Sequence, residues 1–156
     1  MWEHIIGEEE DMAWLVTTFK NGTAVMVTDG SFDRKKARNV SGASWVITCT
    51  KSKIFLKGSF YEVSKSASAY RCELLGLVAL HTLVLAMIEY LHLETALGKA
   101  CCNNIAALNQ SSQQRKRIKS GAKQGDLLWA LRSLKLSLAF QFECEHVDAH
   151  MDRVLL

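Results

Sequence analysis

The chain has 156 residues, of which nearly half are hydrophobic and about a fifth are charged, as expected for one globular domain with its own core. Its formal net charge of +3 is too small to indicate a nucleic-acid partner by itself. The longest apolar run, residues 74–93, is interrupted by Gly76, His81 and Glu89, which disfavours a membrane span, and the acidic residues 1–10 do not resemble a signal peptide. We therefore expect an intracellular protein without a membrane partner.

The cysteines argue against two classes of small protein. There are five, an odd number, two of them are adjacent (Cys101 and Cys102), and no Cys-x-x-Cys pair occurs. Neither a disulfide framework nor a zinc knuckle is therefore indicated. The pattern predicts reduced thiols that are mostly buried.

Short runs rich in β-branched residues open the chain after an N-terminal extension, which we place at residues 1–22. The first strand is predicted at 24–28, and it stops at the turn-forming residues Asp29, Gly30 and Ser31. Further runs at 43–50 and 54–61 predict two more strands. Because the connections between the three strands are short, we expect an antiparallel meander.

The spacing of apolar residues changes to a helical period after the third strand. A helix at 68–93, capped by Ser66 or Ser68, is apolar on most sides and should be covered by a sheet and by neighbouring elements. The remaining patterns predict a strand at 97–102, a short helix capped by Asn103–Asn104 and ending near 110, a loop at 115–123, a helix from Asp126, and a half-exposed strand at 138–147. This order predicts an α/β domain with a mixed sheet and helices on its faces.

Basic residues gather in two segments that are predicted to be loops. The first contains Arg34, Lys35, Lys36 and Arg38, and the second contains Arg115, Lys116, Arg117, Lys119 and Lys123. Such clusters can bind the phosphates of a nucleic acid. They are equally typical of solvated loops, so both interpretations stay open on composition alone.

Three polar residues lie at the ends of elements that should be buried. Asp29 ends the first strand, Glu73 lies near the start of the long helix, and Asn103 ends the fourth strand. Carboxylates that converge in this way can hold a divalent cation, and a pair of such ions can promote hydrolysis of a phosphodiester. Taken singly, each residue is also typical of a turn or of a helix start.

Five segments, in this order, resemble motifs of the ribonuclease H family. They are Thr28-Asp29-Gly30-Ser31 after a valine-rich strand, Gly42-Ala43-Ser44-Trp45-Val46-Ile47, Ala69-Tyr70-Arg71-Cys72-Glu73-Leu74-Leu75-Gly76-Leu77, Cys102-Asn103-Asn104-Ile105-Ala106-Ala107-Leu108, and His146-Val147-Asp148-Ala149-His150-Met151-Asp152. The similarity runs from about residue 23 to residue 156. It is greatest to the domains attached to retrotransposon reverse transcriptases.

This resemblance implies a ribonuclease H-like mixed sheet, with three antiparallel strands followed by parallel strands and with helices on both faces. It implies a metal-dependent endonuclease that cleaves the RNA strand of RNA/DNA hybrids with two Mg²⁺ ions, or with Mn²⁺ in their place. Asp29, Glu73 and Asn103 match the metal-site positions, and His150 matches a histidine on a mobile loop. Ser31 and the basic residues Arg34, Lys35, Lys36, Arg115, Lys116, Arg117 and Lys119 would contact the hybrid, and an upstream reverse transcriptase domain would be a partner.

The chain departs from the family pattern in two places. Asn103 stands where the family has a third carboxylate, and only six residues follow His150, so the C-terminal helix with the fourth carboxylate is expected to be missing. We therefore expect cleavage to be impaired, with a non-catalytic module for hybrid or RNA binding as the alternative. The role of Asp152 stays open, and a zinc site at Cys144, His146 and His150 is a weaker alternative without an obvious fourth ligand.

Overall fold

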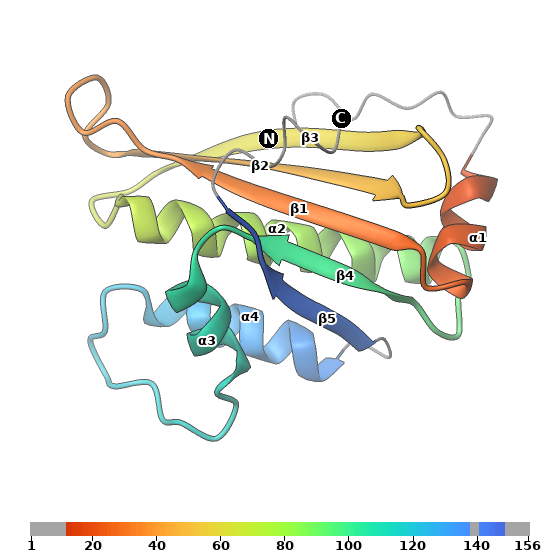
Figure 1. Ribbon diagram of the computed structural model, residues 1–156. Helices are drawn as coiled ribbons and strands as arrows, with labels where there is room; N and C mark the ends of the chain where they lie inside the picture. The colour runs from red at the N-terminus through yellow and green to blue at the C-terminus, as the bar shows by residue number, and fades with distance from the viewer. Residues whose placement is uncertain (1–11, 138–140, 149–156) are drawn as a thin grey trace.

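The computed structural model describes residues 12–137 and 141–148 (Figure 1). In chain order its elements are α1 (Ala13–Lys20), β1 (Ala24–Ser31), β2 (Val40–Cys49), β3 (Phe55–Val63), α2 (Ala69–Tyr90), β4 (Leu97–Cys102), α3 (Ile105–Ser112), α4 (Gly125–Ser137) and β5 (Gln141–His146). The predicted order of strands and helices from residue 24 onward is therefore confirmed.

The five strands form one mixed sheet in the order β3-β2-β1-β4-β5. The pairs β1–β2 and β2–β3 are antiparallel, whereas β1–β4 and β4–β5 are parallel. The predicted meander followed by parallel strands is thus correct. β1 lies in the middle of the sheet and pairs with both kinds of neighbour, with β2 up to Ser31 and with β4 up to Thr28.

Strand β1 continues beyond its predicted end at residue 28. Asp29, Gly30 and Ser31 stay in the ladder because they pair with residues of β2, with Asp29 opposite Ser44. Turn-forming residues therefore remain extended here, since the backbone hydrogen bonds to a long neighbour outweigh their local preference. Strand β4, by contrast, has its predicted limits.

The segment that we assigned to an N-terminal extension contributes a helix to the fold. Helix α1 buries Leu15 and Phe19 completely, in the same cluster as Met26 of β1 and Leu80 of α2. Residues 13–20 therefore belong to the domain rather than to an appendage. This helix is hard to predict from the sequence, because it is only eight residues long and its apolar residues follow a charged run.

Helix α2 is the centre of the core and joins its two halves. One half packs with Trp45 and Ile47 of β2, and the other packs with Leu128 and Leu131 of α4. By length and composition α2 could also cross a membrane, yet most of it is buried between the sheet and α4. The sequence-based interpretation as a buried core helix therefore agrees with its packing.

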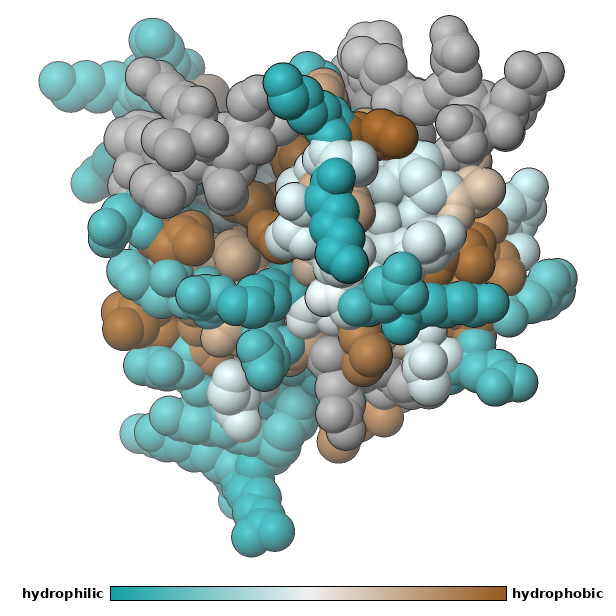
Figure 2. Space-filling view, turned by 45° about the vertical axis from the view of Figure 1, so that its right-hand side comes forward, coloured by the Kyte–Doolittle hydropathy of each residue, from teal (hydrophilic) through white to brown (hydrophobic). Residues whose placement is uncertain are grey.

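The expected helices on both faces are seen on one face only, within the part of the chain that the structure describes. Side chains of β1, β2 and β4 that point toward α2, such as Met26, Ile47 and Ala100, are fully buried. Side chains on the opposite face include exposed ones, such as Ser44 and Lys99. In Figure 1 the ribbon of α2 likewise runs along one side of the sheet. Figure 2 shows one face of the molecule, with hydrophilic side chains mainly toward its edges and less polar ones between them.

Two glycines allow close contacts, one between the sheet and α2 and one between neighbouring strands of the sheet. A Cβ atom on Gly30 would lie 2.7 Å from Cβ of Cys72 and 2.9 Å from the backbone nitrogen of Glu73. A Cβ atom on Gly58 would lie 2.5 Å from the indole ring of Trp45 on the neighbouring strand. Hence β1 touches the first turns of α2 at Gly30, and the Trp45 ring lies across β3.

We predict that Gly30→Ala destabilises the domain by about 1–3 kcal/mol, the usual range for overpacking against atoms that cannot move. The atoms in the way belong largely to the α2 backbone, so the helix start must shift as a whole. Urea unfolding followed by circular dichroism measures the free energy of unfolding.

Gly42→Ala is the matched control, because it lies on the adjacent strand and its added Cβ would meet Ser31 O at an ordinary 3.5 Å. Equal unfolding free energies for the two variants would contradict the close approach at Gly30.

Candidate functional site

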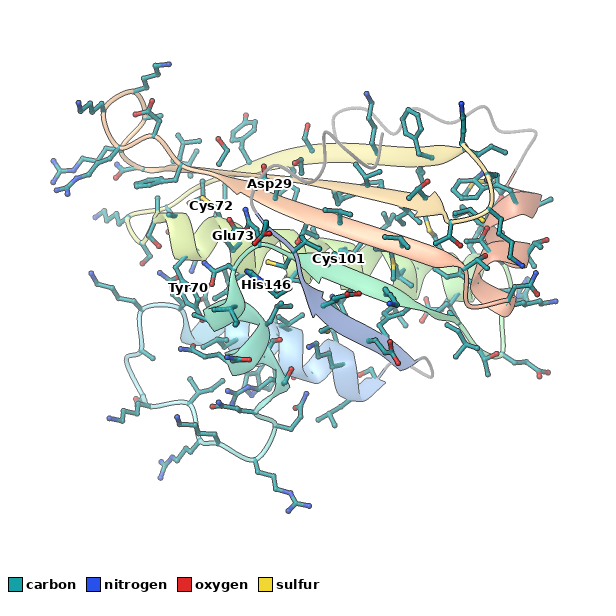
Figure 3. The ribbon with its side chains drawn as sticks, viewed as in Figure 1. Asp29, Tyr70, Cys72, Glu73, Cys101 and His146 are labelled. Carbon is teal, nitrogen blue, oxygen red and sulfur yellow. The ribbon has the colours of Figure 1, made fainter. Side chains whose placement is uncertain are left out.

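The predicted metal-site residues meet at the carboxyl ends of two parallel strands. Thr28 of β1 and Cys102 of β4 are the last paired residues of this ladder, so Asp29 and Asn103 follow them side by side. Glu73 enters from the second turn of α2, because Gly30 lets that helix approach β1 closely. Figure 3 shows Asp29 and Glu73 next to each other at this end of the sheet.

Asn103 is hydrogen-bonded to the first carboxylate. Its Nδ2 atom donates to Oδ1 of Asp29 at 3.3 Å. Because a carboxylate only accepts, the amide presents its NH₂ group to Asp29, and its oxygen points elsewhere. Where a third carboxylate would repel Asp29, this amide thus attracts it.

Glu73 is a buried carboxyl group, only 8% exposed. Burial raises its pKa above the ordinary value, and repulsion by the Asp29 charge raises it further, while hydrogen bonds from Cys102 and from the Gly30 backbone act in the opposite direction. The Cys102 thiol lies 3.7 Å from Oε2 of Glu73. Since burial raises the pKa of Cys102 to about 11, the thiol keeps its proton and can donate it.

Two carboxylates this close, one of them desolvated, form a site where a cation would relieve repulsion. Among residues 12–137 and 141–148, no group of three or more His, Cys, Asp and Glu side chains is arranged to hold a metal ion. Asp29 and Glu73 are therefore a partial fit to a divalent cation. Asn103 brings no charge to this pair, and its NH₂ group rather than its oxygen faces Asp29.

Of the two histidines in the last predicted motif, His146 is among the described residues and His150 is not. His146 ends β5, and its Nε2 atom lies 3.1 Å from the backbone oxygen of Asn103. Sγ of Cys144 accepts a hydrogen bond from the Lys135 ammonium group at 3.5 Å. His150 and Asp152 lie outside the described residues.

The first basic cluster occupies the turn between β1 and β2. Arg34, Lys35, Lys36 and Arg38 are all exposed, and so is Ser31 at the end of β1. Oδ1 of Asp33 accepts hydrogen bonds from the backbone N–H groups of Lys35 and Lys36, at 2.9 and 3.1 Å. This tight turn holds the cationic side chains away from the protein, where phosphates can reach them.

The second basic cluster lies in the loop between α3 and α4. Arg115, Lys116, Arg117, Lys119 and Lys123 are exposed. Buried Arg132 of α4 donates to the backbone oxygens of Gln110 and Lys116 and so attaches the start of this loop to the domain. In Figure 1 this loop and the β1–β2 turn project from the same side of the molecule, on either side of the N-terminal end of α2.

A charged network that sequence reasoning did not find supports the start of α2. The guanidinium group of Arg71, only 4% exposed, binds both carboxylate oxygens of Glu62 at 2.7 and 2.6 Å and both of Asp126 at 3.0 and 2.9 Å. Gln124 accepts a further bond at 3.0 Å. The hydrogen bonds from the Arg71 guanidinium group lower the pKa of Asp126. Nothing in the sequence distinguishes Arg71 from a solvated helix residue, because its partners are 9 to 55 residues away.

The fold is shared with solved ribonuclease H structures. An N-terminal RNase H domain from Mycobacterium tuberculosis, solved as a fusion with maltose-binding protein, has a TM-score of 0.61 and 16% identity, over 84% of this chain and 86% of that one. LC11-RNase H1, isolated from compost and solved in complex with an RNA/DNA hybrid, has a TM-score of 0.65 and 15% identity, over 81% and 86%.

A viral protease-reverse transcriptase contains the same fold as one of its parts. The foamy viral protease-reverse transcriptase, in complex with an RNA/DNA hybrid, has a TM-score of 0.65 and 12% identity, over 97% of this chain and 20% of that one. No family model matches the sequence, and no curated protein sequence does. At these identities the likeness establishes the fold, which is ribonuclease H-like.

We predict that Glu73→Gln stabilises the domain at neutral pH and that this gain depends on pH. The pKa of Glu73 is higher in the folded state than in the unfolded state. At pH values between these two pKa values the folded state binds more protons than the unfolded state. The free energy of unfolding therefore falls as the pH rises through this range. The difference in unfolding free energy between the variant and the unaltered chain should grow from about pH 4 upward and level off above the raised pKa.

Denaturant unfolding from pH 4 to 8 measures this difference. Glu94→Gln is the control, because it removes the same charge from an exposed position. A difference for Glu73→Gln that does not change with pH would contradict the raised pKa of Glu73.

Proposed function

We propose that this chain binds RNA/DNA hybrids and carries an impaired form of a metal-dependent ribonuclease H site. The observation that carries the proposal is the meeting of Asp29 and Glu73 at the carboxyl end of β1, with Asn103 hydrogen-bonded to Asp29. The shared fold supports the hybrid as substrate, because two of the similar structures hold an RNA/DNA hybrid.

Asp29 and Glu73 are the residues that would hold Mg²⁺, or Mn²⁺. When bound, the ion would supply activation of water and stabilisation of the leaving oxygen at the RNA phosphodiester. Glu73 is suited to this role because its buried, repelled carboxylate gains most from a cation. Asn103 contributes no charge, and it presents its NH₂ group rather than a ligand oxygen to Asp29. Cleavage of the RNA strand is therefore expected to be weak.

Binding of the hybrid does not need the metals. The β1–β2 turn and the α3–α4 loop each present exposed cations on the side of the molecule where α2 begins (Figure 1). Contacts from these side chains to phosphates would position the duplex whatever its sequence. The second candidate function, a non-catalytic module that binds hybrid or RNA, is favoured by the same Asn103–Asp29 bond.

The retroelement affiliation belongs to the proposal as well. It is supported by the order of the five motifs and by the likeness to a domain of a viral protease-reverse transcriptase. An upstream reverse transcriptase domain would then be a partner, and the chain would act inside the cell.

We predict that Asn103→Asp restores cleavage of the RNA strand in a labelled hybrid when Mg²⁺ is present. Loss of an outer-sphere partner alone typically costs a metal site about tenfold to a hundredfold in affinity or activity. Restoring a direct ligand should therefore raise the cleavage rate at least about tenfold. Added Mg²⁺ should also raise the melting temperature of the variant more than that of the unaltered chain.

The matched control is Asn21→Asp, which adds the same charge after α1, at the opposite end of β1 from the site. Asn21→Asp should change neither the cleavage rate nor the effect of Mg²⁺ on the melting temperature. If Asn103→Asp binds the hybrid but produces no RNA fragments, the non-catalytic binding module is the better description.

We also predict that hybrid binding weakens with salt and that both basic clusters contribute. Lys35→Ala and Arg117→Ala should each reduce the slope of log affinity against log salt concentration by about one, as expected for the loss of one phosphate contact. Fluorescence anisotropy at several salt concentrations measures these slopes.

Lys20→Ala serves as the control, because Lys20 is exposed at the end of α1, away from both basic loops. Affinity of the unaltered chain that does not change with salt would rule out phosphate binding by the clusters.

A further inference from the structure

His146 reaches from the end of β5 to the residue that follows β4. The parallel ladder ends with the backbone N–H of Val147, which donates to the backbone oxygen of Cys102 at 3.1 Å. The His146 ring adds a bond one residue farther along, from Nε2 to the backbone oxygen of Asn103 at 3.1 Å. Because a carbonyl oxygen only accepts, Nε2 must carry the proton. The imidazole thus extends the strand-to-strand contact beyond the backbone ladder.

Residue 103 is the single residue between β4 and the cap of α3, so small changes in its backbone would redirect its side chain. On the helix side, Asn104 caps α3 by accepting from Ala107 N–H at 2.9 Å, and its own N–H points to the Cys102 sulfur at 3.4 Å. On the sheet side, His146 holds the peptide group that joins residues 103 and 104. These contacts together set the direction of the Asn103 side chain, which donates to Asp29.

We propose that His146 is a positioning residue for the site, holding residue 103 so that its side chain faces Asp29. His146 itself touches neither Asp29 nor Glu73 in any described hydrogen bond, so it acts through the backbone of residue 103. Its side chain is exposed, and replacing it should therefore leave the core intact. The catalytic consequence of this inference rests on the proposed function, whereas the geometric consequence does not.

The geometric test uses the unaltered chain and two variants. His146→Gln can still offer an N–H near the Nε2 position, whereas His146→Phe keeps a ring of similar size without a donor. NMR spectra of the Asn103 side-chain amide protons report their hydrogen bond to Asp29. We expect His146→Phe to shift these signals and speed their exchange with water, and His146→Gln to leave them close to those of the unaltered chain. Melting temperatures should be equal for all three proteins.

The catalytic test places the same substitutions in the Asn103→Asp background. Loss of an outer-sphere contact predicts that His146→Phe lowers kcat about tenfold to a hundredfold while KM for the hybrid stays constant, and that His146→Gln retains the rate. A purely structural role would not give this rescue by glutamine or this split between kcat and KM.

Each outcome decides the inference. Amide signals that do not respond to His146→Phe, or that respond equally to both variants, overturn it. If Asn103→Asp does not cleave hybrids, the proposed nuclease activity fails, and the amide signals alone decide the role of His146.

Discussion

The contact on which the rest of the structure depends is the approach of β1 to the start of α2 at Gly30. A side chain at residue 30 would collide with Cys72 and the Glu73 backbone, so only glycine lets the helix lie this close. The same contact places Glu73 beside Asp29 and sets α2 across the sheet, where it joins the two halves of the core. Arg71, one residue before Cys72, stabilises the start of α2 by donating hydrogen bonds to Glu62 and Asp126.

The charges around the site are separated by sign. Two carboxylates meet at the carboxyl end of β1, and the cations lie in two exposed loops that flank the N-terminal end of α2. A polyanion held by these loops would bring its phosphates toward the carboxylates, where only a cation can offset the repulsion. Under the proposed function, binding and cleavage would be separable, because the loops would contribute the first and the carboxylates the second. Asn103 would then affect cleavage alone.

Much of this arrangement could be predicted from the sequence. The motif around Asp29 and the helix with Glu73 were recognisable because strand ends, caps and apolar spacing are local signals, and the carboxyl ends of parallel neighbours must meet at one edge of the sheet. Helix α1 was missed because its burial depends on Met26 and Leu80, which are distant in sequence. The Arg71 network and the bond from His146 to Asn103 were missed for the same reason, since charge and side-chain type do not reveal a partner.

The hydrogen bond between Asn103 and Asp29 has a consequence for how this site can change over generations. Asn and Asp codons differ by a single base, and the bond keeps the amide where a carboxylate would lie. A lineage that retained only the binding of nucleic acid would also retain the layout of this site. One transition at the first position of codon 103 would place a third carboxylate beside Asp29 and Glu73.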